Sequence, residues 1–102
     1  MYYQNKWYCA APTIEVSTQP IEQVICDRPI VIFRTAESGK LVAMENRCPH
    51  RQAPLSMGKV IGDEIMCIYH GWVMNSSGQC VHIPHQDNIA KSVQIETYPI
   101  VE

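Results

Sequence analysis

Short runs of apolar and β-branched residues alternate with turn-forming residues along the whole chain. Residues 23–26 and 29–34 are rich in Val and Ile, and Asp27-Arg28 between them predicts a turn that joins two strands. Residues 41–46 predict a third strand that follows a hairpin turn at 37–40. Further short strands are predicted at 7–11, 60–61, 64–66, 72–74, 80–83 and 93–98. The last of these alternates cleanly and is expected to be half-buried, so the pattern as a whole predicts an all-β fold.

Size and composition predict one small domain that spans residues 1–102. Of the 102 residues, 46% are hydrophobic and 18% are charged, which is a globular composition. No internal repeat, low-complexity tract or linker divides the chain. A core this small is marginal when burial alone stabilises it, and small folds commonly depend on a metal or on disulfides.

Charge and hydropathy argue against nucleic-acid binding and membrane insertion. The formal net charge is −2, and no basic patch is visible. No apolar stretch approaches the roughly 20 residues needed to cross a bilayer, and no apolar run of a signal peptide follows Met1 to Lys6. The five cysteines show no disulfide framework, so we expect a reducing, cytoplasmic location.

Four residues in two short motifs are candidate metal ligands. Cys48 and His50 form C-x-H, and Cys67 and His70 form C-x-x-H, so each motif offers one thiolate and one imidazole. This differs from the usual structural zinc pattern, in which two Cys come first and two His follow. Two loops of this kind can hold a two-iron cluster from opposite sides, with two Cys on one iron and two His on the other. That is the ligand set of a Rieske [2Fe–2S] centre.

The residues around these ligands resemble a known family. The segments C-P-H-R-x-A-P-L-S-x-G from residue 48 and G-D-x-I-x-C-x-Y-H-G-W from residue 62 resemble the Rieske domain of aromatic-ring oxygenases, of the vanillate O-demethylase and phenoxybenzoate dioxygenase type. The resemblance extends from Trp7 to Pro99. It implies a Rieske-type fold with a β-sandwich-like base, into which a cluster-binding subdomain of short strands and two ligand loops is inserted at about residues 44–83.

Two further residues are predicted to lie at the cluster. Trp72 is expected to pack beside the second loop and to shield the cluster from water. Arg51 follows a ligand directly, and it either offsets cluster charge, contacts a partner or is a solvated surface residue.

The ligand set predicts a one-electron carrier. Neutral imidazoles make the cluster less negative than four thiolates do, which moves the reduction potential from about −400 mV into a window of about −150 to +300 mV. Respiratory-type Rieske proteins add a disulfide between the ligand loops and a hydroxyl donor, but the matching positions here are Ala53, Tyr69 and Trp72. We therefore expect the low end of the window. The resemblance implies a flavin or iron–sulfur reductase as electron donor and the mononuclear iron of an oxygenase domain or subunit as acceptor.

An oxygenase is the second functional hypothesis. The family's catalytic domain follows the Rieske domain and supplies two His and a carboxylate to a mononuclear iron, and nothing in these residues matches it. The sequence ends at Ile100-Val101-Glu102, about where that domain would begin. We therefore expect either a Rieske ferredoxin or the N-terminal part of an aromatic-ring hydroxylating or O-demethylating oxygenase subunit.

Three rival interpretations of the same residues remain open. The four ligands satisfy zinc as well as iron. Cys80-x-His82 is a second C-x-H motif that could replace the first. His82, His85 and Asp87 could be read as a facial triad for a mononuclear iron.

Overall fold

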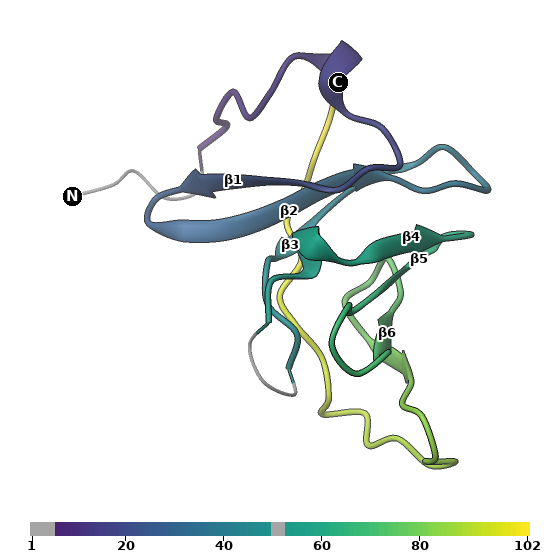
Figure 1. Cartoon of the computed structure of the whole chain (residues 1–102). Helices are drawn as coiled ribbons and strands as arrows, with labels where there is room; N and C mark the ends of the chain where they lie inside the picture. Colours follow the sequence, from purple (N-terminus) through teal and green to yellow (C-terminus); the bar gives the residue numbers. More distant parts are fainter. Residues whose placement is uncertain (1–5, 50–52) are drawn as a thin grey trace.

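Two antiparallel sheets make up the fold in the computed structural model, which describes residues 6–49 and 53–102. Figure 1 shows one sheet above the other, with the C-terminal end of the chain on the side of the first sheet. The first sheet has the order β1-β2-β3, and its strands are Ile21–Ile25, Arg28–Arg34 and Leu41–Glu45. The second has the order β4-β5-β6-β7, and its strands are Lys59–Ile61, Glu64–Met66, Val73–Met74 and Cys80–His82. The described residues hold no α-helix, only 3-10 turns at Thr13–Glu15 and Leu55–Met57, so the all-β prediction is confirmed.

The central strand of the first sheet is buried on both faces. Val31 and Phe33 of β2 belong to the main core, whereas Ile30 and Ile32 belong to a second cluster on the opposite face. This is the period of two that a strand imposes on its side chains. The second cluster is completed by residues of both terminal segments, among them Val16.

The main core lies between the two sheets. The first sheet contributes Phe33 and Met44, and the second contributes Ile65 and Met74. All four side chains are fully buried. One core therefore serves both sheets, and the two predicted cysteine ligands belong to it as well.

A pair of turns joins the sheets at one edge. The backbone N–H of Ala36 donates to the carbonyl of Gly62 at 2.7 Å, and the N–H of Ser38 donates to Asp63 Oδ1 at 3.0 Å. The hydrogen bonds from Ser38 hold the pKa of Asp63 below its ordinary value. The turn between β2 and β3 is thereby attached to the turn between β4 and β5.

The C-terminal segment crosses from the second sheet to the first, and the strand predicted at 93–98 is wrong. The segment first bonds to the second sheet, where the N–H of Ile95 donates to Gly78 O at 2.8 Å. It then bonds to β3, where the N–H of Glu45 donates to Glu96 O at 2.9 Å. Only isolated bridges form, at Gln79↔Gln94 and Met44↔Thr97. The segment changes partner after Ile95, so no ladder long enough for a strand can develop, although Ile95 is buried in the main core as its pattern predicts. We call residues 91–98 the strap.

The strand predicted at 7–11 is also wrong. These residues have irregular backbone. Ala10 and Ala11 pack against the second cluster, while Trp7 is 72% exposed. The other predicted strands are present with ends that shift by one or two residues. The second sheet occupies residues 59–82, and the limits of the inserted subdomain, at about 44–83, stay a prediction.

Candidate metal centre

The two predicted cysteine ligands lie buried at the bases of two loops. Cys48 follows β3 by three residues, and Cys67 follows β5 directly. Their side chains are 1% and 2% exposed, and both belong to the main core. None of the five cysteines is in a disulfide.

The two loops are closed by matching hydrogen bonds. The N–H of Cys48 donates to the carbonyl of Ala53 at 2.7 Å, and the N–H of Cys67 donates to the carbonyl of Trp72 at 2.7 Å. In both cases the acceptor lies five residues after the cysteine. The second loop turns at Gly71, which has a φ of +71° that favours glycine. Each loop therefore has a buried cysteine at its base, and each contains one of the two predicted histidines.

The predicted histidine of the second loop is at the surface. His70 is exposed, and its neighbours Ile68 and Tyr69 are exposed as well. The second loop thus places a thiol inside the protein and an imidazole at its edge. His50 and Arg51, the other two site residues predicted on the first loop, lie outside the described residues.

Trp72 connects the second loop to the main core. Its indole is partly buried and packs against that core. Its carbonyl is the acceptor that closes the loop. The predicted packing of Trp72 beside the second loop and its predicted shielding of a cluster both stay predictions.

Sequence reasoning missed one residue at the base of the first loop. Asn46 is 3% exposed, and its side chain makes hydrogen bonds to Glu22 and Ser56. Its only sequence signal is its place, at the end of the strand predicted at 41–46 and two residues before a predicted ligand, whereas in the structure β3 ends at Glu45. An Asn at such a place is more often a surface turn residue, so the sequence did not single it out.

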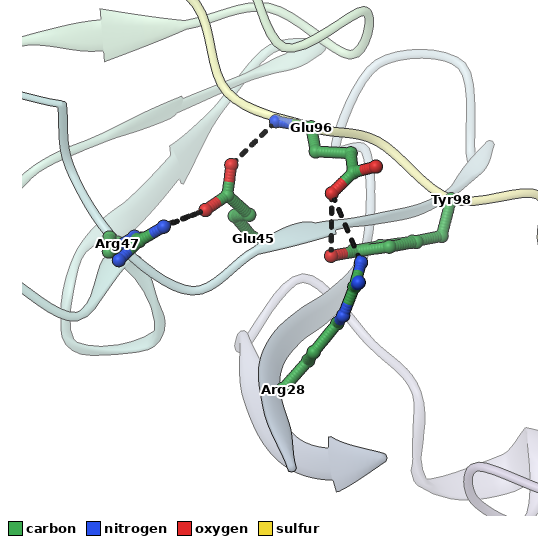
Figure 2. A network of polar contacts seen from close by, with 5 residues as sticks. All are labelled: Arg28, Glu45, Arg47, Glu96 and Tyr98. Atoms are coloured by element: carbon green, nitrogen blue, oxygen red, sulfur yellow. Dashed lines mark hydrogen bonds and ion pairs between the residues drawn. The ribbon is translucent and has the colours of Figure 1, made fainter. Parts of the chain in front are cut away.

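A polar network fastens the strap beside the first loop (Figure 2). Glu45 accepts hydrogen bonds from the backbone N–H of Glu96 at 2.8 Å and from Nε of Arg47 at 3.1 Å. Burial raises the pKa of Glu45, but these hydrogen bonds and the charge of Arg47 together hold it below its ordinary value. The Glu96 carboxylate in turn accepts hydrogen bonds from Arg28 and Tyr98, each at 3.4 Å. The network ends one residue before Cys48.

The structure gives no support to the two rival sites near β7. Cys80 is buried, and its thiol donates to the carbonyl of His82 at 3.7 Å. Burial also raises the pKa of Cys80. Within residues 6–49 and 53–102, no three His, Cys, Asp or Glu side chains gather where they could hold one metal ion. His82, His85 and Asp87 are all described, so the facial triad is not assembled.

The part of the chain that the structure describes contains no helix long and apolar enough to cross a membrane.

Comparison with known proteins gives a consistent result. The chain is 41% identical over 103 residues to the iron–sulfur subunit of the toluene-4-sulfonate monooxygenase system of Comamonas testosteroni. It is 44% identical over 102 residues to the oxygenase component of chloroacetanilide N-alkylformylase of Rhizorhabdus wittichii. These alignments cover 100% of this chain but 29% of each relative.

The solved structure of apo dicamba monooxygenase has the same fold. It matches with a TM-score of 0.90 at 37% identity, over 96% of this chain and 30% of that chain. The family described as Rieske [2Fe-2S] domain matches residues 6–99. The chain therefore belongs to the Rieske [2Fe-2S] domain family, and it is similar to the Rieske region of aromatic oxygenases.

Proposed function

We propose that this chain transfers one electron at a time through a [2Fe–2S] cluster held by Cys48, His50, Cys67 and His70. The donor is a flavin or iron–sulfur reductase, and the acceptor is the mononuclear iron of an oxygenase domain or subunit. The observation that carries the proposal is the pair of matching loops, each closed by a 2.7 Å hydrogen bond from a buried cysteine.

The described residues fit such a cluster. Two thiols lie in one apolar core, on two separate loops, so they can approach a cluster from two sides. When bound, a Rieske cluster accepts and releases one electron at a potential that its imidazole ligands raise. The apolar residues around Cys48 and Cys67 exclude water from the sulfur side.

The exposed side of the site suits exchange with a partner. His70 is at the surface, so its ring is within reach of a docked protein. The ring nitrogen that does not bind iron can hold a proton, which couples electron transfer to protonation. Trp72 packs against the core and accepts the hydrogen bond that closes the loop carrying His70.

Five cysteines without a disulfide suit a reducing compartment, so the cytoplasm is part of the same proposal.

The decisive experiment is assembly of the cluster in protein purified without oxygen. We expect a red-brown protein with two irons and two acid-labile sulfides per chain, and a rhombic electron paramagnetic resonance signal after reduction. His70→Ala should abolish this spectrum, whereas His82→Ala, which changes an exposed histidine on β7, should leave it intact. A colourless protein that binds zinc, or an unchanged spectrum in His70→Ala, would refute the proposal.

The reduction potential gives a second test. The disulfide and hydroxyl that raise the potential in respiratory-type proteins are replaced by Ala53, Tyr69 and Trp72. We expect a midpoint near the low end of the window, at about −150 mV. A midpoint far above zero would contradict the assignment to an oxygenase-type carrier.

A specific observation favours a second, larger function. The relatives include the oxygenase component of dicamba O-demethylase from Stenotrophomonas maltophilia and the oxygenase subunit of vanillate O-demethylase from a Pseudomonas species. In those proteins the matched region is 30% and 24% of the length. We infer that these residues serve as the N-terminal, electron-entry part of an aromatic-ring hydroxylating or O-demethylating oxygenase subunit. With reductase, NADH and aromatic acids, residues 1–102 alone should consume no oxygen in a substrate-dependent way, and product formation by them would contradict the carrier role.

A further inference from the structure

Asn46 is a buried amide with its hydrogen-bonding groups in use. Its Nδ2 donates to Glu22 Oε2 at 2.6 Å and to Ser56 Oγ at 2.8 Å. Its Oδ1 accepts from the backbone N–H of Ser56 at 2.7 Å. Both N–H donors of the amide are therefore satisfied by protein groups. A buried amide held by three bonds keeps one orientation, because any rotation would leave a polar group unsatisfied.

The two ligand loops differ in what fastens them outside the matching hydrogen bonds. Outside the second loop, Met66 of β5 pairs with Val73 of β6, so a strand ladder holds its two ends together. The first loop has no such ladder among the described residues. It leaves from β3, whose partner is β2, and returns through the 3-10 turn Leu55–Met57. At the first loop, the two hydrogen bonds between Asn46 and Ser56 join the two ends of the loop, as the strand ladder does at the second.

Asn46 also attaches the first loop to the first sheet. Its side chain donates to Glu22 on β1, and its backbone N–H donates to the carbonyl of Pro29 on β2 at 3.0 Å. Cys48 follows two residues later, with its own N–H bonded to Ala53. A hydrogen bond to a charged carboxylate is among the stronger ones in proteins, so the Glu22 contact is the firmest of these links.

From this arrangement we infer that Asn46 is a positioning residue for the iron–sulfur centre. Its side chain fixes the base of the first ligand loop and thereby the place of the Cys48 sulfur. The inference rests on the proposed function, because the group that is positioned is a cluster ligand. The Asn46 amide would hold the first loop in place, as strand pairing between β5 and β6 holds the second.

The test compares variants that alter the side-chain hydrogen bonds of Asn46 with a variant that alters another buried polar residue. Asn46→Ala removes all three side-chain bonds. Asn46→Asp retains the acceptor for Ser56 but sets a second carboxylate against Glu22, and adding Glu22→Gln restores a donor between the two. Thr35→Ala is the matched control. Thr35 is 2% exposed and accepts a 2.8 Å hydrogen bond from the N–H of Lys40 within the turn between β2 and β3.

Four readouts on the iron-loaded protein distinguish positioning from general stability. In Asn46→Ala we expect roughly tenfold faster loss of visible colour to a chelator, because a buried hydrogen bond to a charged group is lost. The paramagnetic resonance g values and the midpoint potential should shift, and deuterium exchange should accelerate in peptides covering 46–56 but not in those covering 65–74. Thr35→Ala should lower the melting temperature without any of these changes. Asn46→Asp should resemble Asn46→Ala, and Asn46→Asp with Glu22→Gln should recover most of the wild-type signals.

The outcomes separate the two proposals. A wild-type protein that assembles no cluster refutes the proposed function. A wild-type protein with a cluster, whose Asn46→Ala variant loses only melting temperature as Thr35→Ala does, refutes the positioning role alone. If Asn46→Ala does not fold, the double variant decides. Failure of Glu22→Gln to restore the resonance signal and potential of Asn46→Asp overturns the inference.

Discussion

The two sheets of this molecule are built in different ways. The first has strands of five, seven and five residues in continuous register, and its central strand is buried on both faces. The second has strands of three, three, two and three residues, with a register shift between its last two. The first sheet carries a cluster of its own on the face away from the main core, whereas the second depends on that core. The second sheet, from which the loop of Cys67 leaves, is thus the less regular of the two sheets.

The short strands of the second sheet are supplemented by close backbone contacts that only glycine permits. A Cβ atom on Gly58 would lie 2.0 Å from the carbonyl oxygen of Met66, and one on Gly78 would lie 2.3 Å from that of Ile95. Gly39, in the turn of the first sheet, has no atom within 4 Å of such a Cβ. Backbone packing at the second sheet therefore replaces part of what longer ladders supply to the first.

Removal of iron should have the largest effect, and it should fall on the two ligand loops and on the second sheet. Because metal binding contributes folding free energy, iron-free protein should lose protection where its ligands lie. We expect amide exchange on β5 and β6 to rise at least about 100-fold, while β2 changes little. Deuterium exchange with peptide resolution measures this. Equal loss of protection in both sheets would show that they unfold as one unit.

Gly58→Ala should cost about 3 kcal/mol of unfolding free energy, because the new methyl group meets backbone that cannot move aside. Gly39→Ala is the control, since it has room but a φ of +71°, and should cost about 1–2 kcal/mol. Urea unfolding of the two variants gives the comparison. If Gly39→Ala proved as damaging as Gly58→Ala, the close contact would not be the cause.

Acid should loosen the strap through Glu45. Its pKa in the folded protein lies below the ordinary value of 4.5, so it stabilises the fold fully above that pH. The contribution is lost as pH falls from about 4.5 through the folded pKa. Glu45→Gln should therefore flatten the decline in stability below that pH, whereas the exposed control Glu15→Gln should not. Thermal unfolding of iron-free protein between about pH 3 and pH 7 measures this, and parallel curves for wild type and Glu45→Gln would contradict it.

The smallest effect is expected in the hairpin of the first sheet. Cys26 and Asp27, between β1 and β2, have φ of +55° and +60°, as in the type I′ turn, which favours Asn followed by Gly. Cys26→Asn should stabilise the protein by about 0.5 kcal/mol, because Asn tolerates this backbone region better. The midpoint of urea unfolding should rise slightly, with no change in the visible spectrum. A lower midpoint would show that other contacts of Cys26 outweigh the turn preference.

The strands of the first sheet and the spacing of the predicted ligands can be predicted from the amino-acid sequence. Runs of Val and Ile broken by turn residues define β1 to β3, because strand pairing there joins neighbours along the chain. Cys48 and Cys67 were singled out by their spacing and flanking residues alone. The Val and Ile runs and the ligand spacing are local patterns, so both can be recognised without knowledge of the fold.

The strap and the contacts of Asn46 depend on the packing of the folded domain. The residues from Val93 to Tyr98 have the alternation of a strand, yet they bond first to Gly78 and then to β3, and no local pattern encodes a change of sheet. In the sequence Asn46 is only the last residue of a predicted strand, and the fold brings its partners Glu22 and Ser56 from 24 and 10 positions away. Partners this far apart along the chain are fixed by packing of the whole domain, which is why periodicity and spacing could not reveal them.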